Sequence, residues 1–167
     1  MIIKKDNPAT INAFRNCIAK VVSDISRAQY YFNDQEDKDG LGDLQIKFTD
    51  NSYLTLSGIG DAESIKAVNE KAKIYEAFEV SDNNVASWKL LCLSDHQDWK
   101  KIIGQKLQKV EVEWIIYEPN ENNISACILY FDTDYISFYG TNSDTTNFSV
   151  NVPLPEINVE TRIEVII

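Results

Sequence analysis

The first part of the chain predicts a helix followed by a strand. Asn7-Pro8 is typical of a helix start, because asparagine caps helices and proline tolerates the first helical position. After it, apolar residues recur at helical spacing, at Ile11, Phe14, Ile18 and Val21. A strand is then expected over 25–32. The polar stretch 33–42, with the turn signal Asp39-Gly40, is expected to be a loop.

Alternation with a period of two then predicts a hairpin. Its inward residues are Leu44, Ile46 and Phe48 in one strand and Leu54 and Leu56 in the other. From Asp61 to about Phe78 the spacing becomes helical, with Asp61 as the expected cap. The apolar side of that helix would hold Ile65, Val68, Ala72 and Tyr75.

The middle of the chain predicts a buried strand and a short helix. The apolar run over 88–93 has the length of a strand. Ser94, with Gln97 three residues later, fits the capping box of a helix start. We expect this helix to end at Gly104, since glycine favours the left-handed conformation that follows many helices.

The second half is predicted to be mainly β. Apolar residues alternate at Val110, Val112, Trp114 and Ile116. The segment 124–131 is apolar at successive positions, as in a strand central to a sheet. A turn at 132–134 leads into a strand over 135–139 with Ile136 and Phe138 inward. Further strands are expected over 148–152 and, paired with a sheet edge, over 159–167.

These elements predict an α+β protein, a mainly antiparallel β-sheet with two or three helices packed on it. The 167 residues fit a single domain. Two stretches share an order of residue types, in which Tyr53, Leu54, Leu56 and Gly58 match Tyr135, Ile136, Phe138 and Gly140. This similarity predicts an internal duplication, of about 8–80 and 94–167, into helix-strand-hairpin halves. Chance remains an alternative, because many hairpins alternate apolar residues and end near glycine.

Charge narrows the classes of partner. The chain has 26 acidic and 16 basic residues, for a net charge of −10 at pH 7. So negative a surface repels phosphate backbones, which disfavours nucleic-acid binding. It also speeds encounter with a positively charged protein. The same charge keeps a protein soluble, so it does not by itself require a partner.

The apolar segments and the cysteines both bear on where in the cell the protein is located. The first residues lack an apolar segment long enough for a secretory signal, and no run approaches the roughly 18 residues of a membrane span. Cys17, Cys92 and Cys127 are odd in number and widely spaced among apolar neighbours, as reduced, buried thiols are. We therefore expect a cytoplasmic protein that does not bind membranes.

Few residues have the types and spacing that catalysis or metal binding needs. His96 is the only histidine, and the start of an exposed helix accounts for it. One histidine and scattered cysteines nearly exclude a zinc site of the usual composition. The acidic stretch over 34–43 fails the EF-hand pattern at both ends, and Gly58-Ile59-Gly60 completes no phosphate-binding motif. We expect no catalytic residue, no metal site and no cofactor.

Asp132 and Asp134 leave one enzymatic alternative. Paired carboxylates are the catalytic groups of many hydrolases. The same two residues flank a tight turn, where aspartate is common because its side chain binds nearby backbone amides. A hydrolase would need a concave pocket lined by both carboxylates, at least one of them with a shifted pKa.

Two sets of residues are candidates for binding a protein. The first is the carboxylates of the predicted 33–42 loop and its surroundings, with those at the equivalent place in the second half: Asp34, Glu36, Asp37, Asp39, Asp43, Glu118 and Glu121. They could pair with basic side chains, although a solvated loop has the same composition. The second is outward tyrosines, which suit interfaces but also pack across strands: Tyr53, Tyr135, Tyr139 and Tyr117.

A small acidic domain with acidic loops and outward tyrosines, and without a catalytic set, resembles the immunity proteins of bacterial polymorphic toxin and contact-dependent inhibition systems. The resemblance rests on the layout and composition of the whole chain. It implies a tight complex with a cognate, often basic toxin domain whose active or substrate-binding face is blocked. A structural or adaptor homodimer joined through sheet edges is a further alternative.

Overall fold

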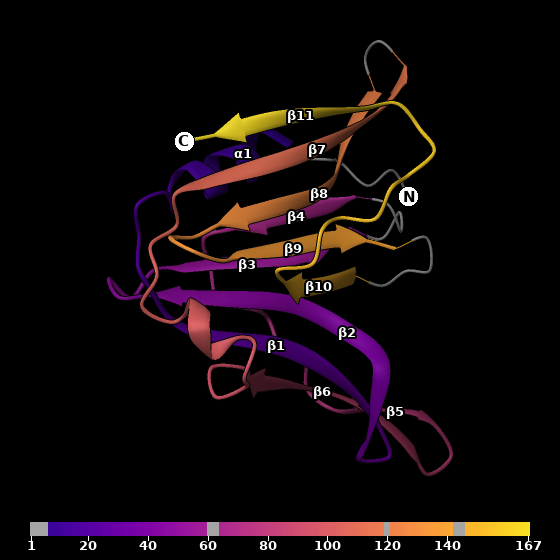
Figure 1. Ribbon diagram of the computed structural model, residues 1–167. Coiled ribbons are helices and arrows are strands. Elements are labelled where there is room, and N and C mark those ends of the chain that lie inside the picture. Colours follow the sequence, from indigo (N-terminus) through magenta and orange to yellow (C-terminus); the bar gives the residue numbers. More distant parts are fainter. Residues whose placement is uncertain (1–6, 60–63, 119–120, 142–145) are drawn as a thin grey trace.

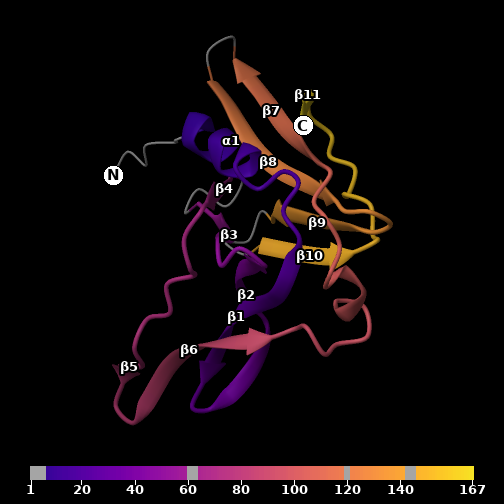
Figure 2. The ribbon, with the colours of Figure 1, turned by 90° about the vertical axis from the view of Figure 1, so that its left-hand side faces the viewer.

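The computed structural model describes residues 7–59, 64–118, 121–141 and 146–167. Strands dominate these residues, which also contain one α-helix, α1 (Asn7–Arg15), and one short 3-10 helix, η1 (Lys100–Ile102). The strands form two antiparallel sheets, and α1 contacts a strand of each (Figures 1 and 2). The α+β class and the mainly antiparallel sheet were predicted correctly. The expectation of two or three helices is not met by the described residues.

The first sheet has six strands in the order β4-β3-β2-β1-β6-β5. Their bounds are β1 Val22–Phe32, β2 Gln35–Phe48, β3 Tyr53–Gly58, β4 Ile65–Val68, β5 Phe78–Ser81 and β6 Asn84–Cys92. The second sheet has five strands in the order β10-β9-β8-β7-β11. Their bounds are β7 Lys109–Glu118, β8 Glu121–Tyr130, β9 Tyr135–Gly140, β10 Thr146–Val150 and β11 Thr161–Ile166.

One hydrophobic core lies between the inner faces of both sheets and α1. The predicted inward residues of β2 and β9 are fully buried: Leu44, Ile46, Phe48, Ile136 and Phe138. Phe138 stacks on Phe148 of β10 with the ring centroids 5.9 Å apart. The alternating pattern therefore placed the inward faces correctly, because apolar residues recur at every second position where a strand meets the core.

The two sheets repeat one strand order. In each, four consecutive strands pair as a meander, and a later strand returns to pair with the first strand of the meander. That returning strand is β6 in the first sheet and β11 in the second, while β5 is an added edge strand. Both first hairpins also have a bulge at the corresponding place, with Gly42 on β2 and Ser125 on β8.

Backbone hydrogen bonds between the two halves come in exchangeable pairs. The amide of Ala19 donates to the carbonyl of Leu107, and the amide of Gly104 donates to the carbonyl of Val22, both at 2.8 Å. Ala19 occupies the place in the first half that Gly104 occupies in the second, and Val22 the place of Leu107. The two hydrogen bonds are therefore equivalent when the halves are exchanged. Ala19 and Gly104 also share a left-handed backbone, with φ of 69° and 85°. The halves are thus joined about an approximate twofold axis.

A long segment crosses the outer face of each sheet before the returning strand. In the first half, Thr55 Oγ1 of β3 donates to the carbonyl of Glu70 at 2.6 Å. In the second half, Ser137 Oγ of β9 donates to the carbonyl of Val152 at 2.5 Å. Since Thr55 and Ser137 occupy the same position in their strands, the two crossing segments are attached in the same way.

The helix predicted from Asp61 to Phe78 is wrong over its described part, and Asp61 itself lies outside the described residues. Ile65 and Ala67 are buried while Lys66 and Val68 are exposed, which is the alternation of strand β4. β4 pairs with the edge of β3, and this backbone pairing outweighs the helical spacing of the apolar residues. The residues after β4 form the first crossing segment.

The predicted helix from Ser94 to Gly104 is also wrong, since this stretch contains turns and only the three residues of η1. Ser94 does not cap a helix. Its hydroxyl accepts a hydrogen bond from the amide of Ile25 in β1 at 3.0 Å and also contacts Asp24. Gly104 does end this region in the predicted left-handed conformation.

Burial differs from the prediction in β6. The predicted strand over 88–93 exists, but Leu90 and Cys92 are exposed. Because β6 lies beyond β1, at the side of the sheet where the second sheet does not cover it (Figure 1), its run of apolar residues does not enter the core. Cys17 and Cys127 are buried as expected, whereas Cys92 is not.

Candidate functional site

The predicted acidic loop is mostly a strand. Asn33 and Asp34, with φ of 49° and 62°, form a two-residue turn, and β2 begins directly after it. Positive φ at both central residues matches the right-handed twist of hairpin strands. The carboxylates of Glu36, Asp37 and Asp39 therefore project from the first part of β2 at the end of a long hairpin (Figure 1). Their placement on a paired strand was missed because glycine and aspartate are rare there.

These carboxylates are exposed and only partly neutralised. Glu36 pairs with Arg27 at 3.3 Å, and Asp34 lies 3.8 Å from Lys89 with 91% of its side chain exposed. Asp37 and Asp39 have no ion pair within the described part of the chain. The four carboxylates at 34, 36, 37 and 39 outnumber the three basic side chains among them, Arg27, Lys38 and Lys89, so a net negative charge remains at this end of the protein. Asp43 differs, because burial raises its pKa against a hydrogen bond from Ser57 that lowers it.

The β5–β6 hairpin is fastened to the acidic hairpin end. The amide of Asn33 donates to the carbonyl of Val85 at 2.9 Å, and the amide of Val85 donates to Asn33 Oδ1 at 2.8 Å. Phe32 and Phe78 both lie opposite Ala86, one on each side of it, and are 43% and 51% exposed. Residues opposite one another in a sheet share a face, so Phe32 and Phe78 lie on one face at this end of the sheet. Glu36 pairs with Tyr31, the neighbour of Phe32, and therefore lies on the other face.

We call this region the hairpin-end surface. It comprises the exposed side chains of Asp34, Glu36, Asp37, Asp39, Phe32, Phe78, Val80 and Val85. Phe78, Val80 and Val85 were missed in the sequence, since 78–85 was predicted to be the end of a helix and a polar loop. The signal that could have found them is the alternation of Phe78 and Val80 with Glu79 and Ser81.

Glu118 and Glu121 do not join this surface. They face each other as the last paired residues of the β7–β8 hairpin, and their side chains lie outside what the structure describes. That hairpin ends on the opposite side of the molecule from the β1–β2 hairpin (Figures 1 and 2). The two sets of carboxylates occupy equivalent places in their halves, but one partner surface would not reach both.

The predicted tyrosines are dispersed as well. The ammonium group of Lys71 lies over the ring of Tyr53, 5.5 Å from the ring centroid. Tyr135 packs against the ring of Tyr130 at 5.7 Å. Tyr139 accepts a hydrogen bond from Asn147 at its hydroxyl, at 3.1 Å. Tyr135 and Tyr139 thus contact residues of the neighbouring strand, as the cross-strand alternative expects, whereas Tyr53 contacts the crossing segment.

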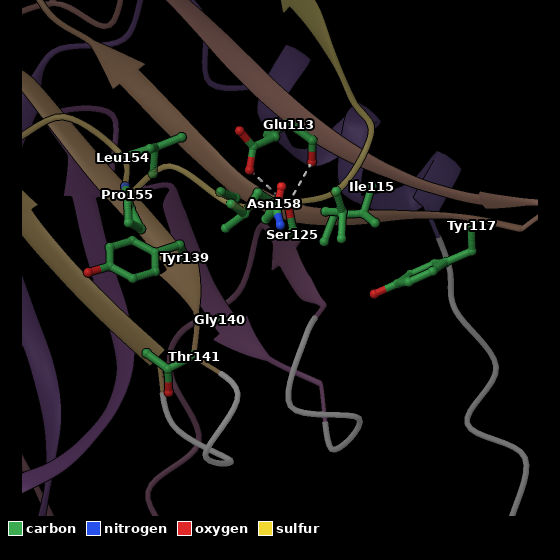
Figure 3. Close-up of a pocket in the computed structure, with 13 residues that line it drawn as sticks. Glu113, Ile115, Tyr117, Ser125, Tyr139, Gly140, Thr141, Leu154, Pro155 and Asn158 are labelled. Carbon is green, nitrogen blue, oxygen red and sulfur yellow. Dashed lines mark hydrogen bonds between the residues drawn. The ribbon is translucent and has the colours of Figure 1, made fainter.

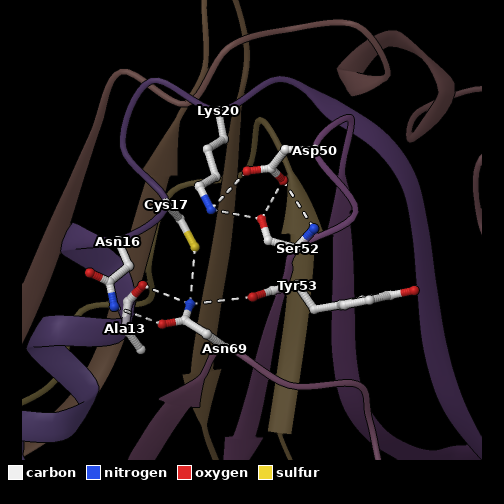
Figure 4. Close-up of polar contacts among 8 residues, drawn as sticks. All are labelled: Ala13, Asn16, Cys17, Lys20, Asp50, Ser52, Tyr53 and Asn69. Atoms are coloured by element: carbon white, nitrogen blue, oxygen red, sulfur yellow. Dashed lines mark hydrogen bonds and ion pairs between the residues drawn. The ribbon is translucent and has the colours of Figure 1, made fainter.

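Polar side chains join the β2–β3 turn to the end of α1 (Figure 4). Asp50 accepts hydrogen bonds from the hydroxyl and amide of Ser52 and lies 3.1 Å from Lys20, and these contacts lower its pKa to about 2. Asn69 donates to the sulfur of Cys17 at 3.2 Å. Burial raises the pKa of Cys17 to about 11, so the thiol is protonated at neutral pH and is not a nucleophile.

The contacts of Asp132 and Asp134 are those of turn residues. Asp132 accepts from the amide of Lys106 at 2.8 Å, and Asp134 accepts from Gln105 Nε2 at 2.6 Å and Asn151 Nδ2 at 2.7 Å. These hydrogen bonds lower the pKa of both carboxyl groups. A general acid needs a raised pKa, so the shift of these two groups is opposite to the one that acid catalysis requires.

A cavity of about 480 Å³ lies on the outer face of the second sheet (Figure 3). Its walls are Ile115 and Tyr117 of β7, Tyr139 of β9, and the crossing segment with Leu154 and Ile157. Polar side chains also line it, among them Glu113, Ser125 and Asn158. Of the tyrosines considered for binding a partner, Tyr117 and Tyr139 reach this cavity.

Over the described ranges, no three His, Cys, Asp or Glu side chains are grouped so as to hold a metal ion. His96 is exposed and contributes only its backbone to the turns before η1. Among the helices within those ranges, none has the length and apolar character to cross a membrane.

No protein-family model, curated protein or solved structure matches the chain. The candidate surfaces therefore rest on the geometry described above.

Proposed function

We propose that this protein is a cytoplasmic binding module for a basic protein, and that it docks through the hairpin-end surface. Its nearest functional analogue is an immunity protein that blocks the active or substrate-binding face of a cognate toxin domain. The supporting observation is that exposed aromatic side chains and exposed carboxylates, two of them without an ion pair, lie at the same end of two linked hairpins.

The apolar part of the surface supplies the affinity in this proposal. Phe32 and Phe78 would be desolvated against the partner, and buried aromatic side chains dominate the energy of protein interfaces. Exposed apolar groups rimmed by polar residues are typical of interaction sites. Hydrogen bonds between Asn33 and Val85 hold the two hairpins together, so little ordering is needed on binding.

The carboxylates supply the choice of partner and the speed of encounter. Four of them stand on one hairpin end of a protein whose net charge is −10. Such a local negative potential attracts a basic surface and repels acidic competitors, and it is screened by salt.

The test starts with a partner captured from native lysate by the immobilised protein and identified by mass spectrometry. Association rates are then measured for the wild type and for a variant in which Asp34, Glu36, Asp37 and Asp39 become Asn or Gln. We expect association to slow about tenfold or more at low salt, since electrostatic steering changes on-rates by 10-fold to 1,000-fold.

The matched control removes the same charge elsewhere, by Asn or Gln at four exposed carboxylates outside the surface: Asp95, Asp98, Glu156 and Glu160. Equal slowing of both variants would mean that net charge and not the hairpin-end surface steers the partner. Unchanged association of the first variant would reject the proposal.

We also propose that the chain arose by duplication of one five-stranded unit. The repeated strand order, the matching bulges and the exchangeable hydrogen bonds support this origin.

A homodimer is a second candidate assembly, because β11 is an edge strand with Ile163 and Val165 exposed. Concentration-dependent light scattering on the isolated protein would detect it.

A further inference from the structure

The cavity on the second sheet is enclosed by a segment that is fastened at both ends. Ser137 holds the start of this segment at Val152, and the amide of Ile116 donates to the carbonyl of Glu160 at 3.1 Å near its end. Between these points the segment spans the outer face of β7, β8 and β9 (Figure 1). A volume of about 480 Å³ lies within the range of small-molecule pockets.

The same place in the first half is filled. Pairing registers make Ala28 the counterpart of Glu113 and Gly42 the counterpart of Ser125. A Cβ atom added at Gly42 would lie 2.8 Å from the ring of Trp88 and 3.0 Å from Cβ of Ala28. The indole of Trp88 therefore rests directly on Ala28 and Gly42.

The counterpart of Trp88 in the second half is Thr161. Trp88 pairs with Tyr30 in the first sheet, and Thr161 pairs with Ile115 at the same position of the second. Replacing an indole by a threonine leaves the outer face without its aromatic cover, and this is where the cavity lies. The first half thus shows which shape fits there, namely a flat ring of the size of an indole.

The floor of the cavity adds a charge that the first half lacks. Ser125 Oγ donates to Glu113 Oε1 at 3.1 Å and lies 3.3 Å from the carbonyl of Glu113 (Figure 3). This hydrogen bond fixes the carboxylate at the cavity and leaves its second oxygen for another donor. A carboxylate among apolar walls favours a ligand with a positive charge or an N–H group.

We infer that this cavity binds a small molecule with a flat aromatic ring and a protonated amine. The ring occupies the place that Trp88 fills in the first half and contacts Ile115, Tyr117 and the crossing segment. The ammonium group donates to Glu113. This site is separate from the hairpin-end surface, so it stands or falls independently of the proposed function.

The probe is tryptamine, which carries an indole ring and an ammonium group. Isothermal titration calorimetry on the full chain is expected to give a Kd of about 1 mM or below. Indole-3-propionate has the same ring with a carboxylate and should bind at least about tenfold more weakly, because Glu113 repels it. Butylamine, which has the positive charge without the ring, should bind as weakly as indole-3-propionate.

Two variants assign the binding to this cavity. Glu113→Gln keeps the volume and removes the charge, and should weaken tryptamine binding about tenfold or more, the usual loss for a hydrogen bond to a charged group. The triple variant Glu113→Ala, Ser125→Gly, Thr161→Trp copies the first half, and its own indole should abolish binding.

Chemical unfolding of each variant checks that it is folded before titration. Absence of heat and of NMR chemical-shift changes with 10 mM tryptamine would overturn the inference, as would equal affinity of the wild type and Glu113→Gln. Binding that survives in the folded triple variant would place the ligand elsewhere and would equally overturn it.

Discussion

Gly42→Ala tests the packing of Trp88 on the first sheet. The added methyl group would meet the Trp88 ring at 2.8 Å, Cβ of Ala28 at 3.0 Å and the Ala28 carbonyl at 3.2 Å. The ring can move, but the two atoms of Ala28 belong to the neighbouring strand and move only with it. Overpacking of this kind costs about 1–3 kcal/mol.

A smaller effect opposes this cost. Alanine restricts the unfolded chain more than glycine does, which stabilises the protein by about 0.4–1 kcal/mol where the backbone is compatible. Gly104 is the glycine with a positive φ among the described residues, so the backbone at Gly42 accepts alanine. The midpoints of the two ranges, about 2 and about 0.7 kcal/mol, leave a net loss of about 1.3 kcal/mol in the free energy of unfolding.

The assay is urea unfolding followed by circular dichroism in a double-mutant cycle with Trp88→Ala. Without the indole, Gly42→Ala should cost less than about 1 kcal/mol, so that the two changes couple by about 1 kcal/mol. A cost that is the same with and without Trp88, or no cost in the wild type, would refute the proposed contact and with it the comparison of the two halves.

Three further predictions concern the core, the thiols and the response to pH. Phe138→Ala should lower the free energy of unfolding by about 3–5 kcal/mol, measured by urea unfolding, because the ring is fully buried and stacked; a loss below about 1 kcal/mol would contradict this packing. Iodoacetamide should label Cys92 quickly and Cys127 only after unfolding, because Cys92 is exposed and burial raises the pKa of Cys127; mass spectrometry would reveal the opposite order. The pKa of Asp50 is lowered from 3.8 to about 2, so its stabilising effect is present above pH 4 and is lost as the pH falls towards 2. Asp50→Asn should therefore flatten the loss of stability in this interval, and an unchanged acid-unfolding curve would contradict the hydrogen bonds of the β2–β3 turn.

The residue pattern predicted the strands that have one clearly buried face. In β2 and β9 polar and apolar residues alternate because one side meets the core, and the same periodicity is visible in the sequence. The pattern failed at 64–78, where apolar residues at helical spacing belong to a short edge strand and a crossing segment. Single hydrogen bonds to distant residues hold such segments, as Thr55 holds Glu70. The spacing of apolar residues within the segment does not indicate these partners.

The candidate site could be predicted only in part. The carboxylates of the β1–β2 hairpin follow from composition, and their exposure follows from their charge. Phe32 adjoins them in the sequence, but the position of Phe78 beside Phe32 depends on the pairing of β1, β6 and β5, and β5 and β6 are far from β1 in the sequence. The cavity was invisible for the same reason, since its floor and its crossing segment meet only after the sheet has formed.

The repeated strand order has a consequence for how the chain can be divided. Each returning strand pairs within its own sheet, and the stretch 94–97, which joins the two halves, contributes no strand to either sheet. Cleavage there would produce two fragments, each able to form every backbone pairing of its own sheet but each with half of an unshielded core. Each fragment alone should aggregate or remain unfolded. When the two fragments are mixed, they should associate into one folded complex, as the subunits of a heterodimer do.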